Sequence, residues 1–254
     1  MMIHSFLLVG QSNAAGRGFL TDAEPLDNCK GKLKVLRNGR WQAMFRPVNP
    51  DCPFSGTCLA ESFAKEYSKA YPALEVGIIP CADGGTTLEQ WKPGELLFEN
   101  AINCAKLAMR TSHLAGVLWH QGEGDCAPDK YPFYIERFKV IMDELRKCLG
   151  MPNIPILVGG LGDFLSDCTL SENMKNYTYV NDALQQIATE YPHCSYVSAK
   201  GLGANPDNLH FSAEALKKFG IRYFNEYQKL GGCHLVNCIN QKENDPLRTE
   251  MELL

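Results

Sequence analysis

A serine near the start of this sequence and a histidine near its end are of the residue types that nucleophilic catalysis needs. Ser12 follows the apolar residues 6–9, and His210 comes three residues after Asp207. A serine hydroxyl becomes nucleophilic at neutral pH when an imidazole accepts its proton, and a carboxylate can hold that imidazole in position. The spacing of Asp207 and His210 would let one side chain orient the other within a single turn. Together the three residues are of the types that a serine nucleophile, its base and an orienting carboxylate require.

Each of these signals also has a purely structural interpretation. A serine at the end of a strand is most often the N-cap of the next helix, and a histidine close to an aspartate is often a surface residue. The glycines of residues 10–18 match neither the dinucleotide-binding pattern G-x-G-x-x-G nor the P-loop. Ala14 replaces the last glycine of the G-x-S-x-G motif found in other α/β hydrolases. No cofactor is therefore expected.

Hydrophobic periodicity indicates the elements that must position these residues. Short uninterrupted apolar runs, typical of buried parallel strands, alternate with segments whose apolar residues recur every three or four positions. This order predicts βαβ units and an α/β fold, a three-layer sandwich with a mainly parallel central sheet. The expected strands are residues 5–9, 75–79, 115–119, 154–158 and 195–198, and the expected helices are residues 59–70, 96–109, 131–149, 179–191 and 213–230.

Polar segments follow the expected strands. The first strand ends in Gly10-Gln11-Ser12-Asn13, the second leads into PCADGGTTLEQW (residues 80–91), and the third leads into WHQGEGD (residues 119–125). The segment PDNLHF, residues 206–211, precedes the last expected helix. Ligands of open α/β sheets bind beyond the carboxyl ends of the strands, so we expect these four segments to meet in one site.

The chain is expected to form one domain. Its 254 residues, 45% of them hydrophobic, suffice for one sizeable core, and no repeat or linker divides them. We place the domain at residues 1–232, with a polar tail at residues 233–254. Residues 19–58 form a long insertion after the first strand, in which Asn38-Gly39 separates two β-like runs and predicts a hairpin with a type I′ turn.

Composition excludes several kinds of partner. The net charge is -4 and no cluster of lysine and arginine occurs, so nucleic acid is not expected. No segment approaches the ~20 apolar residues of a membrane-spanning helix, and the N-terminal segment lacks the features of a signal peptide. The 11 cysteines lack the paired spacing of zinc sites or disulfide scaffolds, which predicts reduced thiols in a soluble, cytoplasmic protein. Cys233, His234 and Cys238 lack a fourth ligand, so no metal is expected.

The four polar segments together resemble the ordered sequence blocks of the SGNH hydrolase superfamily. The blocks are Gly10-Gln11-Ser12-Asn13, Gly84-Gly85-Thr86, residues 120–125 and Asp207-Asn208-Leu209-His210. The glutamine of the first block and the W-H-Q-G-E-x-D form of the third are similar to the sialate O-acetylesterase-like branch, which includes the acetylxylan esterases of carbohydrate esterase family 6. The resemblance covers residues 6–211, and the combination is far more specific than any single block.

The resemblance implies a catalytic triad. Ser12 would be the nucleophile, His210 the general base and Asp207 the carboxylate that orients it. Glu123 is the alternative orienting carboxylate, although the short spacing of Asp207 and His210 favours Asp207. A structural interpretation is equally open for Glu123 and Asp125, as braces of their loop, for instance through Arg17.

The resemblance also implies an oxyanion hole. The expected donors are the backbone N–H groups of Ser12 and of Gly85 or its neighbour Gly84, and the side-chain amide of Gln121, which stands where the superfamily usually has an asparagine. The residues on either side of the serine, Gln11 and Asn13, are expected to contact the substrate. Trp91, Trp119 and His120 are expected to be core or wall residues.

The function that follows is removal of O-acetyl groups from a carbohydrate, such as a xylo-oligosaccharide, by a serine esterase. The sugar would be selected by residues 19–58 and by the loop after Leu161, where no motif indicates which sugar it is. Two alternatives stay open: a non-catalytic α/β module that binds carbohydrate or another small ligand, and a short-chain lipase or thioesterase of the same fold. The sequence has no evident apolar lid, which favours a small acyl group. Nothing in it indicates the oligomeric state.

Overall fold

The computed structural model describes residues 2–231. The expected polar tail, with Cys233, His234 and Cys238, lies outside the described residues. Within residues 2–231, no helix is long and apolar enough to cross a membrane. Within the same range, no three histidine, cysteine, aspartate or glutamate side chains are grouped so that they could hold a metal ion.

A seven-stranded sheet runs through the molecule in the order β3-β2-β4-β1-β5-β6-β7. All neighbouring strands are parallel except β2 and β3. The α/β fold class predicted from the sequence is confirmed, and every predicted strand is present with its ends within two residues. The strands are β1 (Ile3–Gly10), β2 (Leu33–Arg37), β3 (Arg40–Ala43), β4 (Glu75–Pro80), β5 (His113–His120), β6 (Ile156–Gly159) and β7 (Cys194–Val197).

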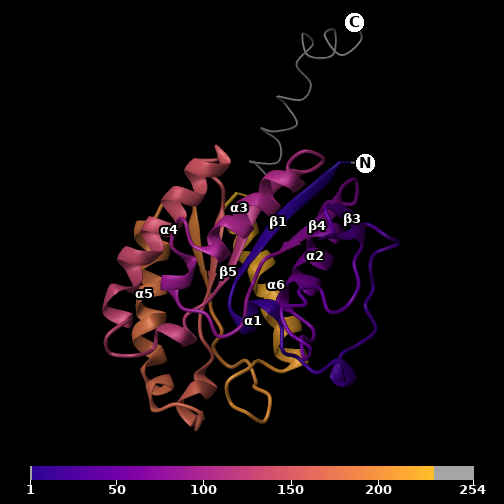
Figure 1. Ribbon diagram of the computed structural model, residues 1–254. Coiled ribbons are helices and arrows are strands. Elements are labelled where there is room, and N and C mark those ends of the chain that lie inside the picture. The colour runs from indigo at the N-terminus through magenta and orange to yellow at the C-terminus, as the bar shows by residue number, and fades with distance from the viewer. Residues whose placement is uncertain (1, 232–254) are drawn as a thin grey trace, which may run out of the picture.

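Helices cover both faces of the sheet and complete the three layers (Figure 1). Along β1, Phe6 and Leu8 belong to one hydrophobic cluster and Leu7 and Val9 to another, because alternate side chains of a strand point to opposite faces. The first cluster contains α2 (Leu59–Ala70) and α6 (Ala213–Lys229), and the second contains α3 (Leu96–Ala108), α4 (Tyr134–Leu149) and α5 (Tyr177–Glu190). The predicted helices are present with ends shifted by at most three residues.

The insertion at residues 19–58 builds one edge of the sheet. Its strands β2 and β3 pair as an antiparallel hairpin, and β2 also pairs in parallel with β4. Asn38 and Gly39 connect the two strands with φ angles of 52° and 74°, as a type I′ turn requires. The predicted hairpin is therefore present.

The strand β1 lies at the point where the chain switches from one half of the sheet to the other. It is flanked by β4 and β5, so the carboxyl ends of these three strands lie side by side. Gly10 ends β1 with a φ of 129°, and a Cβ atom there would lie 2.0 Å from the carbonyl oxygen of His120. Only glycine fits this close approach, which brings the segments after β1 and β5 together at the edge where α/β folds bind ligands.

Candidate active site

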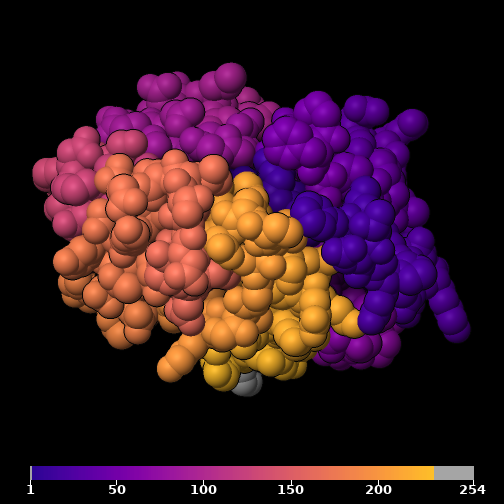
Figure 2. Space-filling model, turned by 90° about the horizontal axis from the view of Figure 1, so that it is seen from below, coloured from indigo at the N-terminus to yellow at the C-terminus, as the bar shows by residue number. Residues whose placement is uncertain are grey.

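Ser12 begins the short helix α1 (Ser12–Ala15) directly after β1. Its side chain faces a cavity of 450 Å³ at the carboxyl edge of the sheet. Figure 2 views the molecule from this side, where indigo atoms from the start of the chain lie against yellow and orange atoms from its end. The backbone N–H of the first residue in a helix has no partner within that helix. The N–H of Ser12 also has no other acceptor among residues 2–231, so it is available to a ligand.

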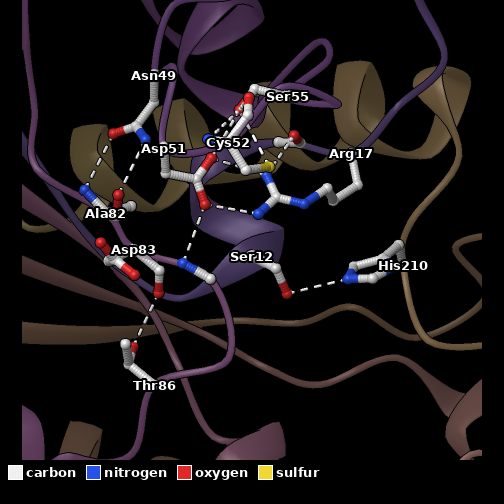
Figure 3. A network of polar contacts seen from close by, with 12 residues as sticks. Ser12, Arg17, Asn49, Asp51, Cys52, Ser55, Ala82, Asp83, Thr86 and His210 are labelled. Atoms are coloured by element: carbon white, nitrogen blue, oxygen red, sulfur yellow. Dashed lines mark hydrogen bonds and ion pairs between the residues drawn. The ribbon is translucent and has the colours of Figure 1, made fainter.

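His210 and Asp207 complete a chain of hydrogen bonds that starts at Ser12. The Nε2 atom of His210 lies 3.0 Å from Ser12 Oγ (Figure 3). The Nδ1 atom of the same ring lies 2.7 Å from Asp207 Oδ2. A carboxylate can only accept hydrogen bonds, so Nδ1 carries the ring proton and Nε2 is left to accept the hydroxyl proton of Ser12. The structure thus brings together the serine, the histidine and the aspartate singled out in the sequence.

A tight turn holds Asp207 in this position. Its Oδ1 atom accepts hydrogen bonds of 3.0 Å from the backbone N–H groups of Leu209 and His210. Asn208, which lies between Asp207 and Leu209 in the chain, adopts a left-handed conformation with a φ of 47°. Burial favours the neutral carboxyl, but the two N–H groups and the imidazole outweigh it, so the pKa of Asp207 lies below its ordinary value. The carboxylate is therefore ionised at neutral pH.

Glu123 makes no hydrogen bond to His210. Its Oε1 atom instead accepts a hydrogen bond of 2.5 Å from Asn13 Nδ2, and its Oε2 atom is buried without a partner within the described residues. The two carboxylates that were candidates for orienting His210 are thus separated by geometry: Asp207 contacts the ring and Glu123 does not. Glu123 does line the cavity. The Arg17 side chain makes its hydrogen bonds with Gly16 and Asp51, not with Glu123.

Asn13, which was expected to contact the substrate, makes its side-chain contacts with the protein instead. Asn13 is fully buried, and its amide is used for three protein contacts. Nδ2 donates to Glu123 and to the carbonyl oxygen of Leu209, and Oδ1 accepts from the backbone N–H of Phe211. Because Leu209 and Phe211 flank His210 in the chain, Asn13 holds the imidazole beside Ser12.

Gln121, which was expected to donate to the oxyanion, also has protein partners for its amide. The side chain is fully buried, and its Nε2 atom donates to the carbonyl oxygen of Thr86 at 3.1 Å and to Asp125 Oδ2 at 2.6 Å. Its Oε1 atom accepts from the hydroxyl of Tyr134. Both amide hydrogens have protein acceptors, so none is left for a ligand. Asp125 also accepts from the backbone N–H of Leu88, so this pair ties residues 86–88 to the end of β5.

The structure distinguishes between the two glycines expected to provide a backbone donor. The N–H of Gly84 donates to Asp51 Oδ2 at 3.0 Å, so it is already occupied. Gly85 has no such bond among the described residues, lies at the cavity, and has a φ of 74° with open space around its Cα. The geometry therefore selects Gly85 as the glycine whose N–H can meet a ligand.

An ion pair that the sequence did not indicate contacts the loop that carries Gly84 and Gly85. The carboxylate of Asp51 accepts hydrogen bonds from both terminal nitrogens of Arg17, at 2.9 and 2.5 Å, and from the hydroxyl of Ser55 at 2.7 Å (Figure 3). Burial favours a neutral Asp51, but the bonds from Arg17, Ser55 and Gly84 outweigh it and lower its pKa. Asn49 adds two bonds to the backbone of Ala82. No motif could have revealed these contacts, because Asn49 and Asp51 come from the insertion.

The cavity around Ser12 combines charged and apolar walls. Phe54, Met174 and Leu209 supply apolar surface, and Phe54 is 73% exposed, with its ring centroid 5.4 Å from the guanidinium carbon of Arg17. Asp83 also lines the cavity, and partial burial and the nearby Asp51 raise its pKa above the ordinary value. Trp91, Trp119 and His120 are buried in the core, as predicted.

The fold and the polar segments at its carboxyl edge first define a class of protein. A mostly parallel sheet between helix layers, with a serine after the first strand and a histidine before the last helix, is the architecture of the SGNH type of α/β hydrolase. Among solved structures, one from Arabidopsis thaliana has a TM-score of 0.78 at 24% identity, covering 89% of this chain and 98% of that one. NanS has a TM-score of 0.72 at 15% identity, covering 90% and 97%.

Sequence comparison then gives the family. A protein of Arabidopsis thaliana named as a probable carbohydrate esterase is 26% identical over 251 residues, which cover 87% of this chain and 89% of that protein. The family model described as carbohydrate esterase, sialic acid-specific acetylesterase matches residues 2–229. The chain belongs to this family, so it is a carboxylic ester hydrolase whose substrates are acetylated carbohydrates.

Proposed function

We propose that this enzyme removes acetyl groups from neutral acetylated sugars, such as xylo-oligosaccharides, with Ser12, His210 and Asp207 as its catalytic triad. The observation that carries the proposal is the unbroken chain of hydrogen bonds from Ser12 Oγ through the imidazole to Asp207. In such a chain the histidine accepts the serine proton while the carboxylate stabilises the imidazolium that forms.

The reaction proceeds in two halves. Ser12 Oγ attacks the acetyl carbonyl carbon and passes its proton to His210 Nε2, while the carbonyl electron pair moves onto the oxygen. When this oxyanion collapses, the ester C–O bond breaks, and the imidazolium gives its proton to the departing sugar oxygen, which leaves as a hydroxyl. Water, deprotonated by His210, then attacks the carbonyl carbon of the acetyl-serine and forms a second oxyanion. When this oxyanion collapses, the bond from the carbonyl carbon to Ser12 Oγ breaks, the imidazolium returns its proton to Oγ, and acetic acid is released, which ionises to acetate. The free N–H groups of Ser12 and Gly85 are available to stabilise both oxyanions.

The charges of the cavity favour a neutral sugar over a sialic acid. Arg17 is the only lysine or arginine that lines the cavity within residues 2–231, and its guanidinium is paired with Asp51. Lys130 reaches the carbonyl oxygen of Gly124 but does not line the cavity. Asp83 adds a carboxylate that has no ion pair among the described residues, so the carboxylate of a sialic acid would meet repulsion. The exposed ring of Phe54 offers an apolar surface for the C–H face of a sugar.

A reducing compartment fits this proposal. Every cysteine within the described residues is a free thiol. Free thiols are the rule in the cytosol, where glutathione and thioredoxin keep cysteines reduced. A cytoplasmic location, as predicted from the sequence, would suit the deacetylation of small imported oligosaccharides.

Acetate release from a panel of acetyl esters tests the proposal. The panel contains acetylated xylo-oligosaccharides, an O-acetylated sialic acid, p-nitrophenyl acetate and p-nitrophenyl octanoate. We expect kcat/KM to be highest for the xylo-oligosaccharides, and a serine-directed phosphonate to abolish all turnover. A preference for the sialic acid would overturn the choice of a neutral sugar. A preference for octanoate would indicate a lipase or thioesterase, and no turnover at all would indicate a binding module.

A further inference from the structure

The orientation of the Gln11 side-chain amide is determined by the hydrogen bonds that its oxygen accepts. Its Oε1 atom accepts two hydrogen bonds of 3.1 Å, from the backbone N–H groups of Gly122 and Gly124. Only the oxygen of an amide can accept a hydrogen bond, so the two ends of this side chain cannot be exchanged. The backbone N–H of Gln11 is also fixed, because it donates to the carbonyl oxygen of His120 at 2.9 Å. The position of the Nε2 atom is therefore determined by the protein alone.

The Nε2 atom of Gln11 is left without a partner in a buried side chain. Only 3% of the residue is exposed, and no acceptor for Nε2 occurs among residues 2–231. Unlike the buried Oε2 atom of Glu123, however, this nitrogen is not sealed from solvent, and Gln11 lines the same cavity as Ser12. An immobilised amide donor without a protein partner thus faces the cavity directly beside the serine.

The oxyanion hole lacks the side-chain donor that the sequence led us to expect. The amide of Gln121 is consumed by Thr86 and Asp125, as described above. We propose that the Nε2 atom of Gln11 takes this role and donates a hydrogen bond to the oxyanion, together with the backbone N–H groups of Ser12 and Gly85. This inference rests on the proposed serine mechanism and adds to it a catalytic residue that is not Gln121.

Immobilisation is what makes such a donor effective. A donor aimed at charge that develops only in the transition state needs no reorganisation when the charge appears, and removing one donor costs about 10²–10³ in kcat. The two glycine N–H groups hold the Gln11 amide in place before substrate arrives. If Gln11 instead bound the ground-state sugar, its loss would raise KM and leave kcat nearly unchanged.

The first test replaces the amide nitrogen alone. Gln11→Glu retains an oxygen for the N–H groups of Gly122 and Gly124 and replaces the donor by an acceptor. With p-nitrophenyl acetate we expect kcat to fall by about 10²–10³, with KM changed by less than about threefold. Gln185→Glu, an exposed glutamine on α5, makes the same change in net charge away from the cavity and should behave as wild type. A Gln11→Glu enzyme that is folded and keeps its kcat would overturn the inference.

The second test needs no variant, so it stands even if a buried glutamate prevents folding. A crystal structure of the wild-type enzyme carrying a phosphonate on Ser12 Oγ would display a tetrahedral oxygen in the oxyanion position. We expect Gln11 Nε2 at about 2.7–3.1 Å from that oxygen. A separation beyond about 4 Å would overturn the inference.

The two tests also separate this inference from the proposed function. If the wild-type enzyme hydrolyses acetyl esters and Ser12→Ala does not, the serine mechanism stands, and only the Gln11 results decide the inference. If wild type is inert towards every acetyl ester, or if Ser12→Ala keeps its activity, the proposed function fails and the inference fails with it.

Discussion

Asp207→Asn should impair catalysis through the protonation state of the imidazole. In the wild type, the carboxylate accepts the Nδ1 proton of His210 at 2.7 Å, which leaves Nε2 free to accept from Ser12. The asparagine oxygen can keep the backbone bonds from Leu209 and His210, which Oδ1 accepts now. Its NH2 group would then face Nδ1 as a donor, so the ring proton would move to Nε2. In that tautomer the imidazole cannot take the proton of Ser12.

The size of the effect follows from the hydrogen bond and its exposure to water. A hydrogen bond to a charged group is worth about 1.5–3 kcal/mol, or about 10- to 150-fold in rate at 1.36 kcal/mol per tenfold. The wrong tautomer adds to this, and in a well-studied buried triad the same substitution costs about 10⁴ in kcat. Here the Asp207 side chain is 37% exposed, so solvent screens its charge. We therefore expect a loss between about 10² and 10⁴ in kcat.

Glu123→Gln is the matched comparison, because it makes the same chemical change at the other carboxylate beside the cavity. Glu123 has no bond to His210, and its one hydrogen bond comes from the neutral amide of Asn13. A glutamine oxygen can keep that bond, so kcat should fall by less than about tenfold. The free energy of unfolding should not decrease, because a buried carboxylate without a cationic partner is replaced by a neutral group.

Steady-state hydrolysis of p-nitrophenyl acetate at neutral pH measures both variants, and circular dichroism verifies that they fold. The reasoning fails if Asp207→Asn stays within about threefold of wild type while Glu123→Gln loses more than about 10³ in kcat. That result would make Glu123 the third member of the triad. Equal and modest losses would mean that both carboxylates support the imidazole.

Three further substitutions test the rest of the site. Ser12→Ala should lower kcat/KM by about 10³ or more with an unchanged unfolding midpoint; turnover near that of wild type would exclude Ser12 as the nucleophile. Gln121→Ala should act mainly on stability, lowering the free energy of unfolding in urea by about 1–3 kcal/mol because buried acceptors such as Asp125 Oδ2 lose a donor; a kcat loss with full stability would restore Gln121 to the oxyanion hole. Asp51→Asn should lower the free energy of unfolding by about 3–5 kcal/mol at neutral pH, because Arg17 stays buried without its counter-ion. The pKa of Asp51 is lowered in the folded state, so its contribution is complete above about pH 4 and disappears as the pH falls through the folded-state value. The difference between wild type and Asp51→Asn should therefore shrink only below about pH 4, and a difference independent of pH would contradict the ion pair.

The parts of the fold and site that could be predicted are those encoded locally. The strands of the sheet have apolar runs of their own, and the hairpin has Asn38-Gly39, whose positive φ angles few other residue pairs adopt readily. Asp207 and His210 could be paired from their spacing, because the turn between them closes through bonds within four residues. In each case, the physical cause lies in a short stretch of chain.

The side-chain roles that the sequence could not decide depend on contacts made in the folded chain, most of them between distant segments. Gln121 and Gln11 are both glutamines in motif blocks after a strand, and nothing local tells which one keeps its amide free. The decision is made by Thr86 and Asp125, which occupy Gln121, and by the Gly122 and Gly124 N–H groups, which occupy only the oxygen of Gln11.

The same limit applies to the choice between the two glycines of the second block. Their sequence context is nearly identical, and each could offer a backbone N–H to an oxyanion. Gly84 is excluded only because Asp51, 33 positions earlier, already accepts its hydrogen bond. No pattern in the insertion marks Asp51 for this purpose, so the selection of Gly85 requires the tertiary structure.

A chain of contacts through the insertion connects the rim of the cavity to the loop that carries Gly84 and Gly85. The exposed ring of Phe54 lies over Arg17, Arg17 pairs with Asp51, and Asp51 holds the backbone of Gly84. A substitution of Phe54 therefore changes the surroundings of Arg17, which is connected through Asp51 to the loop bearing Gly85. Since buried ion pairs have little freedom to adjust, we expect a substitution of Arg17 or Asp51 to shift the loop that carries Gly84 and Gly85. One buried aspartate thus connects the exposed rim of the cavity to the backbone of the loop that carries Gly84 and Gly85.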